Sequence, residues 1–414
     1  RERGTPEIGL DVVLLGRPYT VLDDSMSKGI PGILGTLGMR AYYQDMLPEN
    51  QTEDSTIAEL LDVFHWQYAS RILGYAEYCA ATPGIYPVLL TSFKCSPDSF
   101  MMEYFGAMMD RYGKPYLILQ LDEHESNVGY ETRIEAAVRS FRNHFDLEGS
   151  SEAAKNSPLS RGELPTVSTS LEGKTVLFPN WDPVATPLVV ANLRWAGFDV
   201  RLLEENEKLI RESMKYNTGQ CIPVHIVLHE FAEYLKKYDL DPARSILWMI
   251  KSKWSCNIPL YPHYIKTMLT AIGGGLEKAE VYSGSIVHEE MSKPVAMRGY
   301  FAYLFAGLIR SLSCKIRPYE INEGETDKAA NTAVAMSIEA FLGHLRLDDT
   351  LSEIIELFEG IAYKPEPRPK AAIFGDIYVR DNDVMNQDLV RFIEKSGGEV
   401  VTAPYSDYLR IVSS

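Results

Sequence analysis

The chain of 414 residues has few cysteines, no long apolar run and no surplus of positive charge. Five cysteines in a chain of this length do not form a disulfide framework, and no signal-peptide pattern is present, so we expect reduced thiols and a cytoplasmic location. No stretch is apolar for long enough to span a bilayer. Lysine and arginine number 41 against 57 aspartate and glutamate residues, which gives a formal net charge of −16. This balance argues against nucleic acid or an anionic membrane as the main partner, because both attract basic surfaces.

Phosphate-binding motifs are also missing. The chain has no Gly-x-x-x-x-Gly-Lys-Ser/Thr loop, and no Gly-x-Gly-x-x-Gly sequence opens a helix after a strand. The run Gly273-Gly274-Gly275 is more simply the end of a helix. We therefore expect any ATP hydrolysis to belong to another domain or subunit.

Hydrophobic residues make up 45% of the chain and charged residues 24%, as in ordinary globular proteins. Apolar strand-like runs alternate with helical patterns, which predicts an α/β fold with parallel sheets. Strands are predicted at 12–15, 86–90, 115–121, 175–178, 199–203, 245–250, 278–282, 371–377 and 399–402. Helices are predicted at 34–37, 55–79, 98–112, 132–143, 183–196, 223–237, 261–272, 300–312, 326–345 and 386–395.

The domain organisation follows from a polar segment rich in serine, glycine and proline at 149–172, which reads as a linker. It separates a first α/β domain, 1–148, from a second, 173–414, that contains a helical insertion. A βαβ unit at 370–414 either completes the second sheet or begins a third domain. We expect two Rossmann- or flavodoxin-like parallel-sheet domains that face a cleft, with extra helices.

Three cysteines share one local design: Cys95 in Ser-Phe-Lys-Cys-Ser-Pro, Cys221 in Gly-Gln-Cys-Ile-Pro and Cys256 in Trp-Ser-Cys-Asn-Ile-Pro. Each follows an apolar, strand-like run and has a proline two or three residues later, where a helical pattern opens. Proline is favoured in the first turn of a helix. Each sulfur is therefore predicted at a helix N-terminus, where the dipole lowers the thiol pKa and favours thiolate.

Three such thiolates suggest a metal centre, and an iron–sulfur cluster is the leading candidate. Zinc is the alternative metal, although widely separated cysteines lack the paired spacing of structural zinc sites. Three buried, inert cysteines are the structural alternative. Cys314, in Ser-Cys-Lys-Ile-Arg-Pro, is a reserve ligand or a buried thiol near a helix end, and Cys79 is expected to be structural.

Further candidate residues follow the predicted strands. Arg17 and Tyr19, in Gly-Arg-Pro-Tyr, come after the first strand. Arg17 could bind a phosphate or carboxylate of a substrate, or it could form a domain-bridging ion pair in a tight turn. Asp98 belongs to the same set of candidate substrate-binding residues. Glu123 and His124 follow another strand and could serve as acid or base, or could lie in a solvated loop that leads to the next helix.

Several motifs, taken together and in order, resemble a known family. They are Leu-Gly-Arg-Pro-Tyr (15–19), Lys-Gly-Ile-Pro (28–31), Cys-Ser-Pro-Asp-Ser-Phe (95–100), Gly-Lys-Pro with Leu-Asp-Glu-His (113–124), Thr-Arg-Ile-Glu-Ala (132–136), Thr-Gly-Gln-Cys-Ile-Pro (218–223), Arg-Pro-Tyr-Glu with Gly-Glu-Thr-Asp (317–327) and Phe-Gly-Asp-Ile-Tyr-Val-Arg (374–380). Nearly the whole chain resembles the dehydratase-like region of activator proteins for 2-hydroxyacyl-CoA dehydratases. More broadly, it is similar to the 2-hydroxyglutaryl-CoA dehydratase and benzoyl-CoA reductase component superfamily.

The resemblance implies a 4Fe–4S cluster held by Cys95, Cys221 and Cys256 between α/β domains. It implies low-potential electrons from an ATP-hydrolysing activase domain or subunit. An acyl-CoA substrate or a client dehydratase would be the further partner, in anaerobic metabolism, and a homo-oligomer is compatible with it. An enzyme of this kind would be an ATP-coupled reductase or an acyl-CoA dehydratase component. The chain departs from the family at the third site, where relatives carry a Gly-Pro-Cys-Arg-Phe-Gly-Gln-Tyr-like stretch and this chain has Trp-Ser-Cys-Asn-Ile-Pro-Leu-Tyr.

Three cysteine ligands leave one iron of a cubane open to water or a substrate oxygen, so the cluster could act as a Lewis acid as well as an electron carrier. Two other functions stay open on the sequence alone. One is a metal-free scaffold that docks an activase to its client enzyme. The other is a small-molecule-binding α/β protein that uses the interdomain cleft directly.

Overall fold

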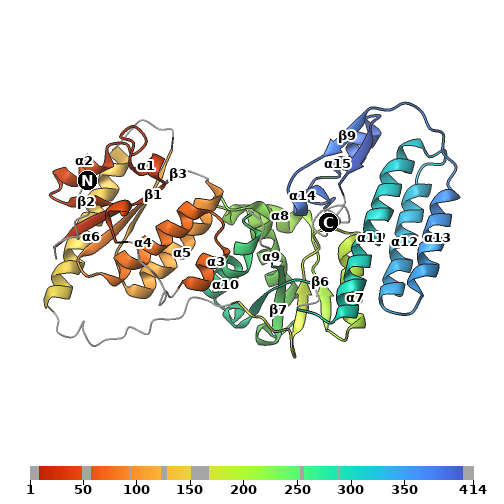
Figure 1. Cartoon of the computed structure of the whole chain (residues 1–414), viewed down its shortest axis with the longest axis horizontal. Helices are drawn as coiled ribbons and strands as arrows, with labels where there is room; N and C mark the ends of the chain where they lie inside the picture. The colour runs from red at the N-terminus through yellow and green to blue at the C-terminus, as the bar shows by residue number, and fades with distance from the viewer. Residues whose placement is uncertain are drawn as a thin grey trace. The chain divides into compact units, whose positions relative to one another are not determined.

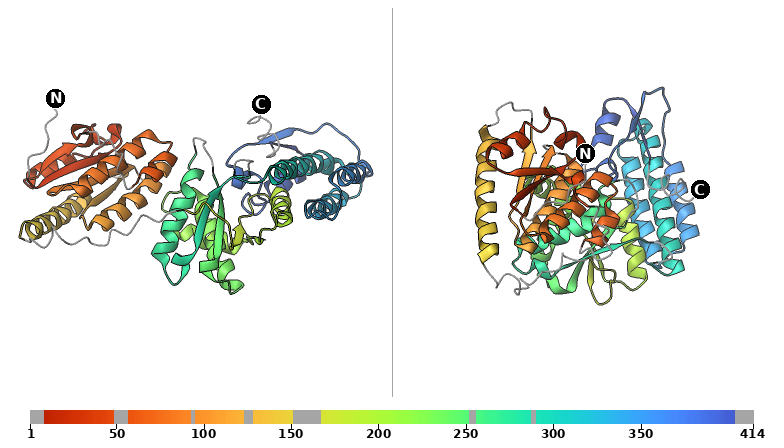
Figure 2. Two further views of the ribbon diagram at one scale, coloured as in Figure 1. Left: turned by 60° about the horizontal axis from the view of Figure 1, so that its bottom comes forward. Right: turned by 60° about the vertical axis from the view of Figure 1, so that its left-hand side comes forward.

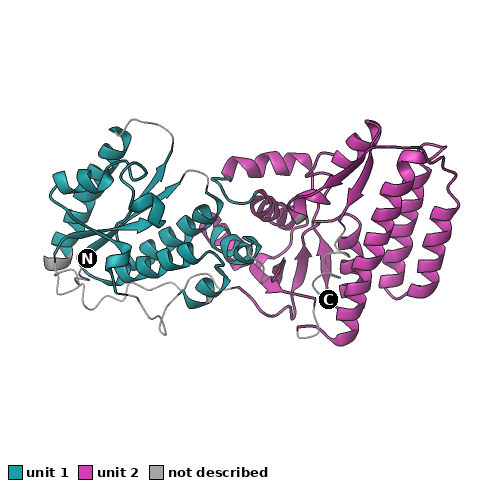
Figure 3. Cartoon of the chain, turned by 45° about the horizontal axis from the view of Figure 1, so that its top comes forward, with its two compact units in different colours: residues 1–166, 217–221, 252–268 teal, residues 167–216, 222–251, 269–414 magenta. Residues whose placement is uncertain are grey.

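A computed structural model of the chain describes residues 9–48, 57–92, 95–122, 128–150, 167–251, 256–286 and 290–403. The chain divides into two compact units (Figure 3). Unit 1 comprises 1–166, 217–221 and 252–268, and unit 2 comprises 167–216, 222–251 and 269–414. The segments 217–221 and 252–268 fall in the range that the sequence analysis assigned to the second domain. They belong to unit 1 because their residues pack there rather than beside their chain neighbours.

Unit 1 is built on a four-stranded parallel sheet with the strand order β2-β1-β3-β4. Its strands are β1 (Asp11–Gly16), β2 (Arg40–Tyr43), β3 (Ile85–Ser92) and β4 (Leu117–Leu121). Its helices are α1 (Pro18–Val21), α2 (Ile30–Thr36), α3 (Ala58–Val63), α4 (Gln67–Ala81), α5 (Ser96–Tyr112) and α6 (Val128–Ser150). In the register of the sheet, Val12 lies beside Ala41 on one side and Tyr86 on the other.

Both faces of this sheet are covered, which explains why β1 and most of β3 are buried along their length. One face packs against α2 and α6 in a core that includes Val12, Val88 and Ile134. The ring of Phe141 on α6 stacks on Tyr86 of β3, with centroids 4.8 Å apart. Helices α4 and α5 lie on the opposite side of the sheet (Figure 1).

Unit 2 repeats the same topology with the parallel strand order β6-β5-β7-β8. Its strands are β5 (Thr175–Phe178), β6 (Val200–Leu202), β7 (Ser245–Ile250) and β8 (Glu280–Gly284). Helices α7 (Ala185–Trp195), α8 (Glu207–Ser213), α9 (Ile222–Lys237) and α10 (Tyr261–Ile272) follow individual strands, and α10 begins in the segment that belongs to unit 1. Short 3-10 turns occur in both units. In unit 1 they lie at Gln44–Met46 and Ile258–Leu260, and in unit 2 at Met214–Tyr216, Pro242–Arg244, Leu276–Lys278 and Arg317–Tyr319.

Three long helices extend unit 2: α11 (Lys293–Ile316), α12 (Glu325–Phe341) and α13 (Leu347–Glu359). They lie side by side (Figure 1 and Figure 2), and α11 and α12 pack against α7. Phe305 of α11 meets Phe341 of α12 edge to face, with ring centroids 5.5 Å apart. Among the described residues, no helix has the length and hydrophobicity needed to cross a bilayer.

The C-terminal segment forms a small parallel sheet of β9 (Lys370–Ile373) and β10 (Glu399–Thr402), with α14 (Ile377–Arg380) and α15 (Leu389–Lys395) between them. Ile373, Val390 and Val400 form a core with Cys314 of α11. This βαβ unit therefore forms its own two-stranded sheet against α11 and does not extend the sheet of β5 to β8.

The predicted α/β class is confirmed by two parallel sheets with a flavodoxin-like strand order. In such sheets, ligands bind beyond the carboxyl ends of the strands, where the strand order reverses. That point lies between β1 and β3 in unit 1 and between β5 and β7 in unit 2.

Some predicted elements are wrong in extent. The pattern over 55–79 predicts one helix, but the described part forms α3 and α4 with an extended break at Phe64 and Trp66. The break is set by tertiary contacts, since Phe64 packs edge to face on Tyr104 and Trp66 bonds to Asn257. Helix 326–345 ends earlier, at Phe341, and a separate α13 follows.

Candidate functional site

The first part of the site lies at the carboxyl ends of β1 and β3. Gly16 ends β1 with φ 154°, and a Cβ at this position would lie 2.5 Å from the carbonyl oxygen of Leu90 on β3. Only glycine permits this close approach at that backbone angle. The turn that follows places Arg17 beside the start of α5, where Cys95 is the N-cap residue and a proline occupies the first turn.

Arg17 links the cysteine to a buried carboxylate. Its Nη2 donates to the sulfur of Cys95 at 3.3 Å, and its Nε donates to Asp98 Oδ1 at 2.9 Å. Asp98 is 2% exposed and also accepts a hydrogen bond of 2.7 Å from the hydroxyl of Thr91. The Arg17 Nη1 donates to the hydroxyl of Tyr19 at 3.0 Å, and that tyrosine is half exposed. Asp98 therefore holds the guanidinium in place.

The expectation that the helix N-terminus lowers the pKa of Cys95 is wrong in the metal-free protein. Burial raises the pKa of the Cys95 thiol, and the negative charge of Asp98 adds to this effect. The backbone N–H of Asp98 and the guanidinium of Arg17 favour the thiolate but do not offset the loss of solvation. A bound metal ion would reverse this balance, because a coordinated thiol is deprotonated.

The second part of the site is the loop that carries Cys221 directly before α9. The side chain of Gln220 is buried, and its Nε2 donates to the backbone oxygen of Ser99 at 3.2 Å. Its Oε1 accepts from the backbone N–H of Thr218 at 3.1 Å. The loop is thus fixed to the first turns of α5, in the same unit as Cys95.

The third part is the segment of Cys256, which precedes the 3-10 turn at Ile258–Leu260 and then α10. The next residue, Asn257, is 8% exposed. Its Nδ2 donates to the hydroxyl of Ser96 at 2.9 Å and to the sulfur of Cys221 at 3.4 Å. Its Oδ1 accepts a hydrogen bond of 2.9 Å from the indole of Trp66, which orients the amide.

These contacts bring the three predicted cysteine segments together within unit 1. The sulfur of Cys221 lies 3.5 Å from the hydroxyl of Ser96, the residue after Cys95, and 3.4 Å from the amide of Asn257, the residue after Cys256. All three cysteines are partly exposed, whereas Cys79 and Cys314 are buried. Among the described residues, no group of three or more histidine, cysteine or acidic side chains is close enough to hold a single metal ion. A cubane cluster is larger than one ion, so its ligands stand farther apart.

The remaining candidate residues do not belong to the group formed by the three cysteine segments. Glu123 and His124 lie outside the described residues. Cys314 lies on α11 in unit 2, where it packs on Ile373 and Val400, and burial raises the pKa of its thiol. We therefore leave this reserve cysteine out of the ligand set proposed below.

Sequence reasoning missed the polar residues that join the cysteine segments, namely Ser96, Asn257 and Trp66. A weak signal was present, because Ser96 and Asn257 each directly follow a singled-out cysteine. Nothing in the sequence pairs Asn257 with Trp66, which is 191 residues away. Neither any family model nor any curated protein or solved structure matches the chain.

The Arg17 contact leads to a prediction for the metal-free protein. Replacement of Arg17 by leucine removes the positive partner of the Cys95 sulfur and leaves the Asp98 charge uncompensated. Both changes favour the neutral thiol, so we expect the pKa of Cys95 to rise further above its ordinary value. The pH dependence of Cys95 alkylation, followed by peptide mass spectrometry, measures this shift.

The matched control is Arg139→Leu, which removes an exposed arginine from α6. It should leave the alkylation profile unchanged. An identical profile for Arg17→Leu and the parent chain would show that Arg17 does not act on this sulfur.

Proposed function

We propose that Cys95, Cys221 and Cys256 hold one 4Fe–4S cluster and that the chain is an electron-transfer module of the 2-hydroxyacyl-CoA dehydratase and activator type. The observation that carries the proposal is the meeting of the three cysteine segments at the sulfur of Cys221. The donor set fits the group, since all three are partly exposed cysteines that form no disulfide. The motif resemblance points to the same cofactor.

The residues around the sulfurs suit a cluster that accepts electrons. The Arg17 guanidinium and the Asn257 amide donate to the sulfurs of Cys95 and Cys221. Such hydrogen bonds stabilise the more negative, reduced form and so raise the reduction potential. When bound, a cluster with three cysteine ligands supplies one-electron transfer and one iron with an open position.

The proposal places the chain between two partners. Low-potential electrons would come from an ATP-hydrolysing activase domain or subunit, consistent with the absence of a phosphate-binding loop in this sequence. The electron would pass to an acyl-CoA substrate or a client dehydratase. The half-exposed Tyr19, bonded to Arg17, lies at the carboxyl edge of the sheet, where such a ligand would enter.

Anaerobic reconstitution with iron and sulfide tests the cluster directly. We expect roughly four iron atoms and four sulfides per chain and a brown colour with absorbance at about 400 nm. Alanine in place of Cys95, Cys221 or Cys256 should each remove most of the bound iron, because a cubane needs all three sulfurs to stay attached.

The control variants are Cys79→Ala and Cys314→Ala, which remove the two buried cysteines and should retain the full iron content. If each single variant at the three proposed ligands binds as much iron as the parent chain, the assignment is wrong. A colourless protein that binds zinc instead would support the alternative metal. A colourless protein that binds neither metal would support the scaffold function.

A further inference from the structure

A cavity of about 350 Å³ lies within unit 2, outside the cysteine site. Its volume is at the lower end of the range of about 300 to 1,000 Å³ typical of small-molecule sites. It lies between α11, α12, α15 and the loops before α7 and after α14. The apolar part of its wall consists of Pro183, Val184, Ile309, Ala330, Val334 and Val390.

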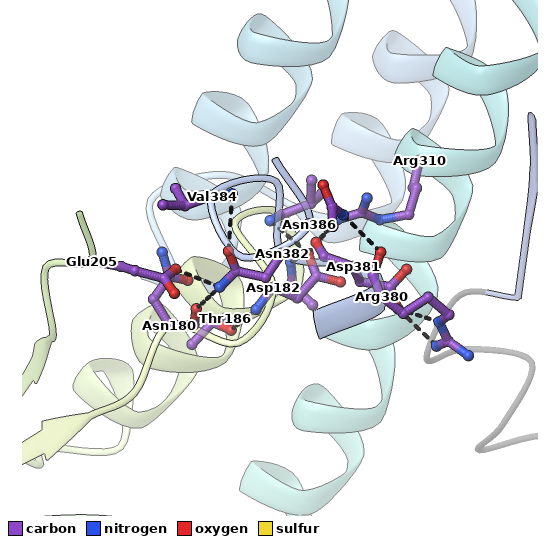
Figure 4. A network of polar contacts seen from close by, with 12 residues as sticks. Asn180, Asp182, Thr186, Glu205, Arg310, Arg380, Asp381, Asn382, Val384 and Asn386 are labelled. Atoms are coloured by element: carbon purple, nitrogen blue, oxygen red, sulfur yellow. Dashed lines mark hydrogen bonds and ion pairs between the residues drawn. The ribbon is translucent and has the colours of Figure 1, made fainter. Parts of the chain in front are cut away.

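Arg310 presents unused donors to this cavity. Its side chain is buried, and its Nη2 donates to Asp182 Oδ1 at 2.8 Å and to the backbone oxygen of Asp381 at 3.0 Å (Figure 4). Among the described residues, no acceptor lies within hydrogen-bonding distance of its Nε or Nη1. Neither nitrogen is among the fully buried side-chain atoms without a partner, so both keep access to the cavity and can donate to an acceptor there.

Asp383 presents a carboxylate to the cavity, with a charge opposite to that of Arg310. It lines the same cavity, and no described residue donates a hydrogen bond to its carboxylate or forms an ion pair with it within 4.0 Å. Burial raises the pKa of Asp383, and the more distant charge of Arg310 offsets only part of this effect. A positively charged donor in the cavity would stabilise this carboxylate.

The other charges around the cavity are already paired. Arg317 bonds to Asp327 and Glu394, and Arg391 bonds to Asp327. The lining residues and their direct ion-pair partners comprise three arginines, at 310, 317 and 391, and four carboxylates, at 182, 327, 383 and 394. The surplus of one negative charge disfavours a simple anion as the occupant and favours a ligand that carries a positive group.

We propose that this cavity binds an α-amino acid with an apolar side chain. The ammonium group pairs with Asp383, the carboxylate accepts from the free N–H groups of Arg310, and the side chain contacts Val334 and Val390. This combination supplies both missing partners without adding net charge, and the apolar wall accommodates the remainder of the molecule. The site uses residues of unit 2 alone and does not depend on a cluster in unit 1.

Calorimetry of the full chain with five probes tests the proposal. L-leucine, L-valine and L-methionine serve as amino acids, and 3-methylbutylamine and 4-methylpentanoate each lack one charged group of leucine. We expect millimolar or tighter binding of at least one amino acid, with both truncated probes weaker by roughly tenfold or more, because each loses one charge-assisted contact.

Asp383→Asn should weaken binding of the same amino acid roughly 10- to 100-fold. This variant should fold, because it removes an unpaired carboxylate rather than a contact. Asp348→Asn, at an exposed position of α13, is the matched control and should bind like the parent. Ala330→Phe fills the cavity and should abolish binding. No binding of any amino acid, equal binding of 4-methylpentanoate, or full affinity in Asp383→Asn would each overturn the proposal.

Discussion

Replacement of Arg310 by methionine should lower the free energy of unfolding of unit 2 by about 3 to 5 kcal/mol, the range for breaking one side of a buried ion pair. Arg310 lies on α11 and donates to Asp182, which is 3% exposed, and to the backbone of Asp381, which is fully buried. Burial lowers the pKa of Arg310, but Asp182 and Asp381 raise it above its ordinary value. Without the guanidinium, buried Asp182 loses its ion-pair partner, and the backbone oxygen of Asp381 loses a hydrogen bond.

The hydrogen bonds of Arg310 also hold three parts of unit 2 together. Asp182 lies in the loop after β5 and accepts from the backbone N–H groups of Val184, the N-cap residue of α7, and Ala185, its first residue. Asp381 belongs to the C-terminal βαβ segment and pairs with Arg380 (Figure 4). Arg310 therefore joins α11 to the loop at the start of α7 and to the C-terminal segment, so its loss should loosen all three.

Urea unfolding followed by tryptophan fluorescence measures the effect, since three of the five tryptophans, Trp181, Trp195 and Trp248, lie in unit 2. The control is Arg346→Met, which breaks the exposed pair of Arg346 and Asp349 and should cost less than about 1 kcal/mol. Addition of Asp182→Asn to the Arg310 variant should recover part of the loss. Equal destabilisation by the two arginine variants would contradict the assigned role.

The second large expected effect is the dependence of the stability of unit 2 on pH. Glu230 on α9 is 1% exposed, and neither of its carboxyl oxygens has a hydrogen-bond partner among the described residues. Glu205 follows β6; its Oε2 accepts from Asn382, while its Oε1 is buried without a partner. Burial raises the pKa of Glu205 to about 7, and burial together with the charge of Glu205 raises the pKa of Glu230.

The direction of the effect follows from proton linkage. Both carboxyls hold their protons more tightly in the folded state than in the unfolded state. Their stabilising contribution is complete below the unfolded value of 4.5 and is lost as the pH rises, for Glu205 between 4.5 and about 7. For Glu205 alone the loss is on the order of 3 kcal/mol. Unit 2 should therefore become less stable from pH 5 to pH 8.

The double variant Glu205→Gln and Glu230→Gln should remove most of this dependence and should be more stable than the parent at pH 8. Thermal unfolding at several pH values between 5 and 8 measures the difference. Glu353→Gln, at an exposed position of α13, should change neither the slope nor the stability. If the double variant follows the parent at every pH, the two glutamates do not carry a folding-linked proton.

Local patterns in the sequence were sufficient to predict many of the helices and strands. The strand at 399–402 is found as predicted, and Gly113 ends α5 in the left-handed conformation with φ 61°. Cys95 caps α5 with a proline in the first turn, as the Cys-Ser-Pro sequence indicates. Helix α13 could also have been predicted, since Thr350, Ile354 and Phe358 lie on its buried face at helical spacing.

Within the site, the sequence by itself selected the three cysteines and their places before helices, because strand periodicity, proline preference and helix capping act between residues a few positions apart. Only the tertiary structure decided that Ser96 and Asn257 meet at Cys221, at separations of 125 and 36 residues, and that Arg17 reaches Cys95 across 78 residues. It also decided the pKa of Cys95, because burial depends on what packs around a side chain. These properties arise from contacts between segments that are distant in the sequence. The free energy of such contacts cannot be inferred from a local sequence pattern.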